Sequence, residues 1–344
     1  MSHNHVGLMT RKGALRAGAA AAAAGAGVLL GRPRPAPAQT AAAVGTPGAI
    51  LGGAIAAGGG WEVVDLSVTT GEEYPVNFPG DPQFDSIPLS WFKRRRGPTG
   101  TGNSGAVKEG VAAVSRYEIT EHTGTQVDFP PHFVPPPGVN IPGARGNAFG
   151  RKTGDRYQLS ALMGAAVVVD LRDVLARHKA KGKSAQVSRA WLERWEARHG
   201  RFGAGEVPLL YSGYTDLYFK RFPDRDRTQD RLLWKPLVDK SEPGWVVLTP
   251  AAVELLFDRG VAHIATDAPS FGAAEDPQPT HVAGLERGMT WTESTIGLGR
   301  LPLRGAFYVA APYKVQDQQA AIARGFAFSP KGAARVQDGT PLKL

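Results

Sequence analysis

Four side chains that can bind a metal ion or move a proton fall within eleven residues of the sequence: His122, Gln126, Asp128 and His132. Two consecutive prolines precede His132 and argue against a helix here. In an extended chain alternate side chains point the same way, so positions 122, 126 and 128 share one face. The segment is therefore predicted to be extended, with three potential metal ligands on one side.

An imidazole, an amide oxygen and a carboxylate on one face form a set of ligands suited to a divalent cation. Gly124 permits a bend that would let them converge. His132 follows in the same local structure, where its imidazole is available for proton transfer at neutral pH. We predict a metal site at residues 122, 126 and 128 and an acid–base role for His132.

The elements that must position these side chains form a mixed α/β pattern. A continuous apolar run at 165–171 is typical of a strand buried on both faces. Further strands are predicted at 61–66, 207–212, 261–266 and 306–312. Helices are predicted at 188–199, after the capping residue Ser188, and at 249–259, after Thr249. The run at 91–110 is rich in Gly, Lys and Arg and is predicted to be a surface insertion.

The first cluster resembles the signature His-x-Gly-Thr-His-x-Asp-x-Pro-x-His of the cyclase family, the metal-dependent hydrolases that include bacterial kynurenine formamidases. The resemblance implies that His122 and Asp128 are metal ligands and that His132 is the general base or acid. The sequence departs from the signature at Gln126, where the family has its second histidine.

A second pair of residues supports the same resemblance. His281 and Glu293 are twelve residues apart and resemble the family's distal His and Glu, which complete the site and can hold a second ion bridged by the aspartate. Further matching pieces lie at 64–67, 78–81, 168–171, 266–270 and 311–312. The resemblance therefore spans about 61–328.

The resemblance implies a single mixed α/β domain with the family's swivelling β/β/α fold, assembled as a homodimer or homotetramer. It also implies a small-molecule substrate with an amide, cyclic-amide or lactone bond, cleaved by an arylformamidase-like amidohydrolase that acts on C–N bonds other than peptide bonds. In that chemistry a metal makes water more acidic and polarises the substrate carbonyl, while His132 transfers protons.

Gln126 bears on the identity and number of the ions. An amide oxygen binds more weakly than an imidazole and shifts the preference from zinc towards harder ions such as Mn²⁺. One or two ions of Zn or Mn are expected at His122, Gln126, Asp128, His281 and Glu293. The same departure favours an alternative function, a non-catalytic exported protein that binds a metal or ligand on a cyclase scaffold. An oxidoreductase is disfavoured, because no glycine-rich dinucleotide loop follows a predicted strand.

Four further titratable residues are predicted to be solvated or structural. His178 and His199 sit among Arg and Lys on predicted helices. His263 lies inside a hydrophobic strand, and Asp267 lies beside a Pro-Ser turn, where a carboxylate acts as a cap.

Residues 1–38 have the three parts of an export signal. A basic start at Arg11 and Lys12 precedes an apolar stretch, and Ala36-Pro37-Ala38 is a site of the kind that signal peptidase accepts. The start resembles a twin-arginine signal with Lys12 in place of the second arginine. We expect a periplasmic or secreted protein that begins near Gln39. The expected divisions of the chain are this signal (1–38), a flexible linker (39–60), the hydrolase domain (61–330) and a C-terminal tail (331–344).

Composition excludes several other classes. The chain has no cysteine, so disulfides, thiolate metal sites and a cysteine nucleophile are ruled out. The formal net charge is +9, but residues 1–38 carry five basic and no acidic residues, and the remaining +4 gives no ground for a nucleic-acid partner. After the first forty residues no apolar run approaches the roughly 18–20 residues that a membrane helix needs, so stable membrane insertion is not expected.

Overall fold

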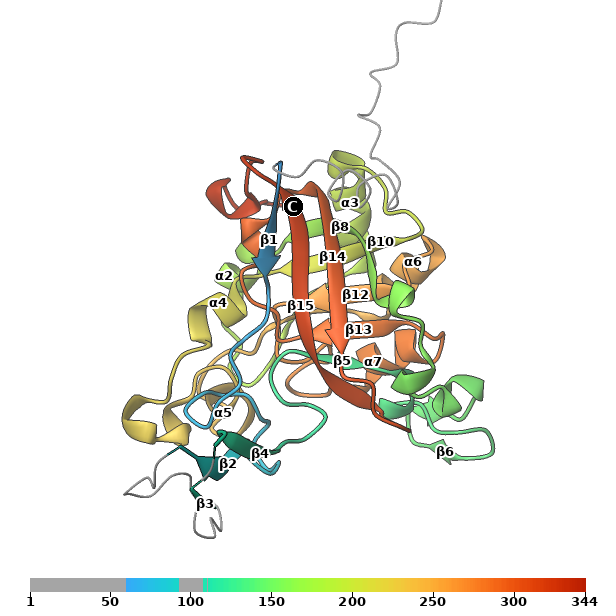
Figure 1. Ribbon diagram of the computed structural model, residues 1–344. Helices are drawn as coiled ribbons and strands as arrows, with labels where there is room; N and C mark the ends of the chain where they lie inside the picture. Colours follow the sequence, from blue (N-terminus) through green and yellow to red (C-terminus); the bar gives the residue numbers. More distant parts are fainter. Residues whose placement is uncertain (1–59, 93–107, 110) are drawn as a thin grey trace, which may run out of the picture. The chain divides into compact units, whose positions relative to one another are not determined.

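The computed structural model of the protein describes residues 60–92, 108–109 and 111–344 (Figure 1). The predicted export signal, the predicted linker up to residue 59 and most of the predicted surface insertion (93–107 and 110) lie outside the described residues. The described residues all fall within one compact unit, 44–344. In this part of the chain, no helix has the length and apolar character that crossing a membrane would require.

An eight-stranded sheet forms the centre of the unit, in the order β1-β15-β14-β8-β10-β12-β13-β5. Strands β8, β10, β12 and β13 are parallel to one another, and the remaining neighbours pair antiparallel. Strand β5 also pairs with β15, which closes the sheet on itself in a barrel-like arrangement. The strands are β1 (Trp61–Asp65), β5 (Gln126–Asp128), β8 (Met163–Asp170), β10 (Glu206–Tyr211), β12 (His263–Thr266), β13 (Thr290–Glu293), β14 (Arg304–Pro312) and β15 (Ala320–Pro330).

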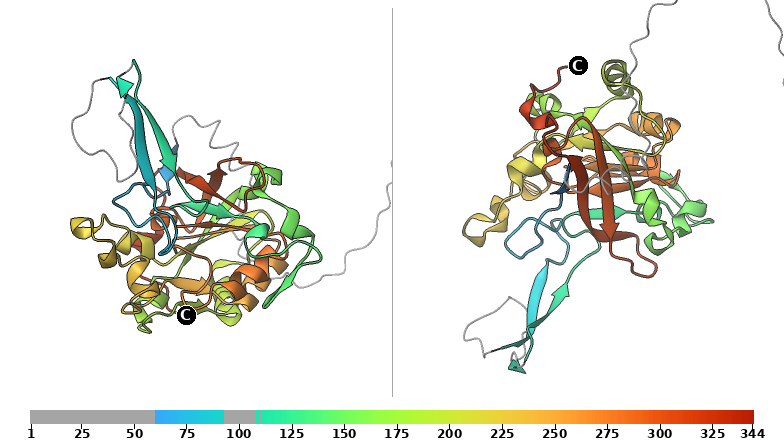
Figure 2. Two further views of the ribbon diagram at one scale, coloured as in Figure 1. Left: turned by 90° about the horizontal axis from the view of Figure 1, so that it is seen from below. Right: turned by 45° about the horizontal axis from the view of Figure 1, so that its top comes forward.

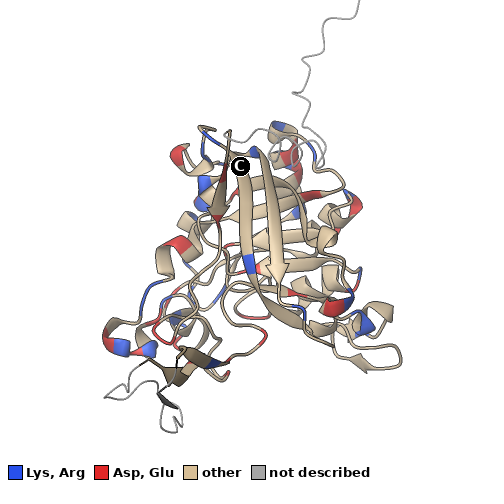
Figure 3. Ribbon diagram, in the orientation of Figure 1, with Lys and Arg blue, Asp and Glu red and all other residues tan. Residues whose placement is uncertain are grey.

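Helices follow the parallel strands and pack beside the sheet (Figure 1). Basic and acidic residues are interspersed over the helices and loops, whereas the strands of the central sheet carry few of them (Figure 3). This distribution leaves the sheet apolar on the faces that form the core. The helices are α2 (Arg172–Arg177), α3 (Arg189–His199), α4 (Tyr214–Tyr218), α5 (Trp234–Leu237), α6 (Pro250–Asp258) and α7 (Gln278–Leu285).

Alternate residues of β8 enter two different hydrophobic cores. Val167 and Val169 join a cluster that includes residues of α3 and α6. Ala166 and Val168 join a second cluster, which includes residues of β5 and β14. The four side chains are buried, and this confirms the prediction of a strand at 165–171 that is covered on both faces.

Helices α3 and α6 begin at the residues that the capping pattern predicts. The Ser188 side chain accepts a hydrogen bond from the backbone of Trp191, and Thr249 accepts one from Ala252. Pro250 occupies the first position of α6, where its missing N–H is no loss. The predictions of helices at 188–199 and 249–259 are confirmed.

The described residues also form smaller sheets and short 3-10 helices. Strands β2 (Asp85–Trp91), β3 (Lys108–Glu109) and β4 (Val114–Glu118) form one sheet, which extends away from the central one (Figure 2). Strand β6 (Asn140–Ile141) pairs with β7 (Ala144–Arg145), and β9 (Ala185–Val187) pairs with β11 (Val246–Leu248). The 3-10 helices are η1 (Pro130–His132), η2 (Ala148–Arg151), η3 (Gly154–Arg156), η4 (Leu159–Leu162), η5 (Pro223–Arg225), η6 (Arg227–Gln229), η7 (Leu298–Arg300) and η8 (Val336–Asp338).

The C-terminal segment 331–344 is packed against the domain. Arg172 of α2 donates hydrogen bonds to the carbonyls of Val336 and Gln337, both at 3.0 Å. Leu342 and Leu344 contact the core that α3 and α6 share. The segment that the sequence places in a tail is thus held by both polar and apolar contacts.

Candidate metal centre

The register of β5 sets the geometry of the site. Gln126 lies directly opposite Glu293 of β13, and Asp128 lies opposite Trp291. Residues directly opposite in an antiparallel pair project on the same face of the sheet, and so do residues two positions apart along a strand. Gln126, Asp128 and Glu293 therefore share one face, although Gln126 and Glu293 are 167 residues apart in sequence.

A tight turn brings His122 back over β5. Gly124 adopts a left-handed conformation (φ +64°), and a Cβ on it would lie 3.2 Å from side-chain atoms of both Val68 and Thr70. The next residue, Thr125, donates its hydroxyl to the carbonyl of Ser294 at 2.7 Å and accepts from the backbone of Val68 at 3.0 Å. The bend expected at Gly124 is confirmed, and only a glycine fits it without strain.

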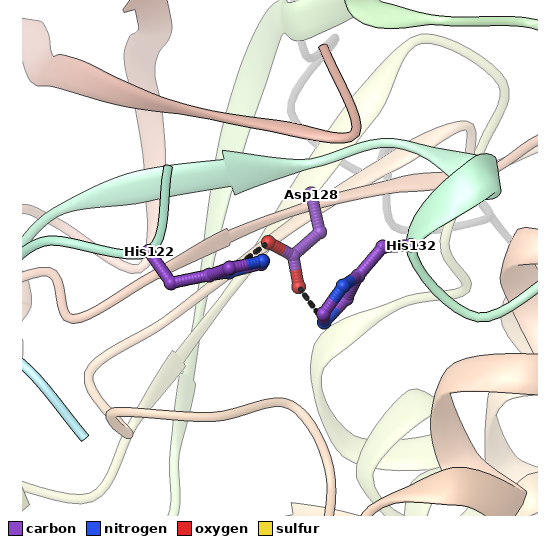
Figure 4. Close-up of side chains that lie close together, drawn as sticks. All are labelled: His122, Asp128 and His132. Carbon is purple, nitrogen blue, oxygen red and sulfur yellow. Dashed lines mark ion pairs between the residues drawn. The ribbon is translucent and has the colours of Figure 1, made fainter. Parts of the chain in front are cut away.

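Asp128 lies at the centre of the cluster. Its carboxylate is fully buried and faces His122 Nδ1 at 3.3 Å and His132 Nε2 at 3.8 Å (Figure 4). His281 Nε2, from α7, lies 3.5 Å from the same carboxylate and 3.2 Å from Glu293 Oε1. Two overlapping groups of potential ligands result, His122–Asp128–His132 and Asp128–His281–Glu293, and the ligand atoms of each group lie within 4.8 Å of one another.

The prediction that these residues converge is confirmed, whereas their roles as metal ligands stay predictions. Their chemistry fits a divalent cation. Within the part of the chain that the structure describes, neither oxygen of the buried Asp128 carboxylate has a hydrogen-bond partner. A buried carboxylate without hydrogen bonds is costly, and a cation that accepts its electron pairs removes that cost. The residues present therefore fit the metal that the sequence predicts.

His281 is held in an orientation suited to a ligand. Its Nδ1 donates to the carbonyl of Pro277 at 2.7 Å, which leaves Nε2 directed at the two carboxylates. Phe133 stacks on its ring with centroids 4.2 Å apart. Burial alone would lower the pKa of His281, but Asp128 and Glu293 raise it to about 9. A cation bound between these carboxylates would displace that proton.

The other ionisable groups respond to the same crowding. Burial would raise the pKa of Asp128, yet the imidazoles of His132, His122 and His281 hold it below its usual range. Burial and the charge of Asp128 raise the pKa of Glu293. Burial, together with the other two imidazoles, lowers the pKa of His132 to about 3, so its ring is neutral at physiological pH.

Gln126 enters the site with its amide nitrogen towards its neighbours. Nε2 donates to Glu293 Oε2 at 2.9 Å and lies 3.0 Å from His122 Nδ1. The sequence predicts an oxygen ligand at this position, whereas the atom that faces the two neighbours here is a hydrogen-bond donor.

A cavity of about 630 Å³ opens beside the cluster. His122 and His132 line it together with Glu121 and Gln319, and the rings of the two histidines lie 4.1 Å apart. Asp128 is fully buried behind these rings. A substrate in the cavity would therefore contact His122 and His132 before Asp128.

His263 and Asp267 have the surroundings of structural residues. Both ring nitrogens of His263 bond to threonine hydroxyls, Thr290 at 2.7 Å and Thr292 at 2.9 Å, and burial lowers its pKa to about 3. Asp267 accepts from the backbone of Ser212 at 2.9 Å and from its hydroxyl at 2.7 Å, just before α4 begins. Burial raises the pKa of Asp267 to about 7.

Three groups of the site could not be identified from the sequence. Phe133 follows His132 directly, but its sequence position does not distinguish it from an aromatic residue of the core. The Pro277 carbonyl and the Phe271 N–H, which donates to Glu293 Oε1 at 2.5 Å, are backbone groups. Backbone groups leave no signal in the residue types, so the fold alone could show them.

The family model described as "Putative cyclase" matches residues 64–273, more than half of the chain, and the protein belongs to this cyclase family. The match includes His122, Asp128 and His132, whereas His281 and Glu293 lie beyond its end.

Individual relatives agree with this assignment. Isatin hydrolase of Roseibium aggregatum is 26% identical over 218 residues, which is 62% of this chain and 73% of the relative. A crystal structure of an isatin hydrolase bound to the product analogue thioisatinate superimposes with a TM-score of 0.61 at 22% identity, over 82% of this chain and 98% of the other. Isatin hydrolase A from Ralstonia solanacearum gives 0.60 at 22% identity, over 86% and 100% of the two chains. The expected cyclase-family fold in a single mixed α/β domain is confirmed.

Proposed function

We propose that this protein is a metal-dependent hydrolase that opens a cyclic amide by adding water across its C–N bond. The observation that carries the proposal is the buried Asp128 carboxylate, which has ligand groups around it and a cavity beside it. The preference for a cyclic amide is supported by the similarity to isatin hydrolase, because isatin is a cyclic amide. Linear arylformamides and lactones are chemically close and belong to the same proposed range.

The residues that would hold the cation are Asp128, His281 and Glu293, which form the fully buried group. When bound there, a divalent cation supplies Lewis acidity, which makes a neighbouring water more acidic and a carbonyl carbon more electrophilic. The single hydrogen bond that fixes His281 to Pro277 keeps its second nitrogen directed at the carboxylates.

His132 would carry the protons. Its ring borders the cavity and its Nε2 lies 3.8 Å from Asp128, so it can reach both a water near the carboxylate and a substrate in the cavity. A neutral imidazole accepts a proton from the attacking water and returns one to the leaving nitrogen. The negative charge of Asp128 stabilises the imidazolium between these two transfers.

A substrate panel tests this proposal. Protein loaded with Mn²⁺ or Zn²⁺ is mixed with isatin, formanilide and an aryl lactone, and hydrolysis is followed by absorbance. We expect turnover of the cyclic amide, and a loss of at least about 100-fold in Asp128→Asn, because the neutral amide removes the central charge.

Asp258→Asn is the matched control, since Asp258 is exposed on α6 and should keep the wild-type rate. Metal binding without hydrolysis of any member of the panel would contradict the proposal and favour the non-catalytic binding protein.

A further inference from the structure

The amide nitrogen of Gln126 faces two atoms that could otherwise bind a metal ion. One N–H donates to Glu293 Oε2 at 2.9 Å, and the other faces His122 Nδ1 at 3.0 Å. An amide nitrogen has no lone pair to offer a cation, because that pair is delocalised into the carbonyl. In this arrangement Gln126 donates hydrogen bonds and is not a ligand.

The same contact affects His122. Its Nδ1 is the ring atom that faces Asp128, at 3.3 Å, and hence the atom that would bind an ion beside that carboxylate. When Nδ1 carries no proton, a hydrogen bond from Gln126 engages its lone pair. The half of the site formed by His122 and Gln126 therefore lacks two of its ligands, and His132 is the remaining imidazole on that side of Asp128.

The other half of the site consists of Asp128, His281 and Glu293. Hydrogen bonds from neighbouring groups fix the orientation of His281 and Glu293. Asp128 Oδ2 and Glu293 Oε1 lie 3.5 and 3.2 Å from His281 Nε2. Pro277 fixes the imidazole, and the Phe271 N–H and the Gln126 amide fix the two oxygens of Glu293. The three side chains are at most 2% exposed, so each is positioned before any ion binds.

We propose that this chain holds a single divalent ion, bound by Asp128, His281 and Glu293, and that Gln126 is a positioning residue that orients Glu293. The inference rests on the proposed metal-dependent function and specifies its metal site. Turning the Gln126 amide to offer its oxygen would break the bond to Glu293 and leave a buried carboxylate oxygen facing an amide oxygen, which is unfavourable because neither oxygen can donate.

Metal content tests the proposal without reference to activity. Full-length protein is saturated with Mn²⁺, desalted and measured by mass spectrometry of the metal, for the wild type and for His122→Asn and His281→Asn. These variants remove one imidazole from each half of the site and keep a polar side chain in its place. We expect about one ion per chain in the wild type, the same in His122→Asn, and at least tenfold weaker Mn²⁺ binding in His281→Asn.

A further variant tests the role of Gln126. Gln126→His restores a nitrogen ligand and removes the amide donor, so we expect it to bind a second ion per chain. Anomalous scattering from Mn²⁺ in wild-type crystals should place the ion between His281 and Glu293, and this readout does not depend on how a variant folds.

The outcomes separate the two proposals. Two ions in the wild type, or loss of the ion in His122→Asn, would overturn the single-ion inference and leave metal-dependent hydrolysis intact. Failure of the wild type to bind any divalent ion would overturn both.

Discussion

At the scale of single residues, the site is organised around one buried charge. Asp128 is surrounded by three imidazoles and shares one face of the sheet with Glu293 of β13. Burying two carboxylates side by side is unfavourable unless positive charge lies between or beside them. Without an ion the His281 imidazolium supplies this charge, and a metal cation bound beside the two carboxylates would take its place.

His132 is predicted to act on protons without binding the metal. His132→Ala should keep the metal content of the wild type and lose about 10²–10⁴-fold in kcat, because the proton acceptor at the cavity is removed. The measurement pairs metal analysis with steady-state kinetics.

His178→Ala serves as the control, since the His178 ring bonds to the carbonyl of Lys183 at the surface. This variant should match the wild type in both readouts. A His132→Ala protein with wild-type kcat would show that another group moves the proton.

The sequence identifies the residues of the site better than it identifies their contacts. Residue types and spacing were enough to single out His122, Asp128 and His132, and the resemblance added His281 and Glu293. The direction of the Gln126 amide could not be predicted, because it depends on Glu293, which lies directly opposite it only in the folded register. The anchors of His281 and Glu293 are backbone groups, which every residue possesses.

At the scale of elements, a three-residue strand carries the centre of the site, Gln126 and Asp128. Strand β5 hydrogen-bonds on both edges, to β13 and to β15, so its short length is offset by two ladders. The turn at Gly124 leads into it and is tied to the chain near Val68 through Thr125. Small changes in this turn should therefore alter the affinity of the candidate centre for a metal ion.

Gly124→Ala tests that connection. A side chain at φ +64° costs about 1–2 kcal/mol, and its Cβ would press on Val68 and Thr70. We expect a loss of at least about 1 kcal/mol in the free energy of unfolding, measured with urea, and a weaker affinity for Mn²⁺.

The matched substitution is Gly203→Ala, where a Cβ would meet open space and the backbone is not left-handed. Its effect should stay within about 0.5 kcal/mol. If Gly124→Ala is as stable as Gly203→Ala, the turn does not require glycine.

Elements with strong local signals could be predicted, and elements that depend on distant partners could not. Helices α3 and α6 carry their own caps, and β8 is a continuous apolar run, so each was evident from its sequence. Strand β15, the longest strand of the sheet among the described residues, could not be predicted, because its many alanines and a central Arg-Gly pair do not suggest a strand. Strand β15 is stabilised by its partners β1, β14 and β5.

At the scale of the whole molecule, closure of the sheet creates the site. Strand β15 begins beside β5 and continues along β14 and β1, and its pairing with β5 brings the segment around Asp128 next to β13 and α7. Composition does not require this closeness, and only the family resemblance predicted it. The fold of the cyclase family thus positions the residues of the site, while Gln126 and its neighbours determine which ions they bind.

The central claim is that a metal ion bound at this cluster is needed for hydrolysis. The most direct test is to strip the wild-type protein with a chelator, titrate Mn²⁺ back, and record bound metal and isatin opening in the same samples. We predict no turnover in the stripped protein and a rate that rises in proportion to the bound metal until the site is full. A stripped protein that contains no detectable metal and still opens isatin at the full rate would contradict the account.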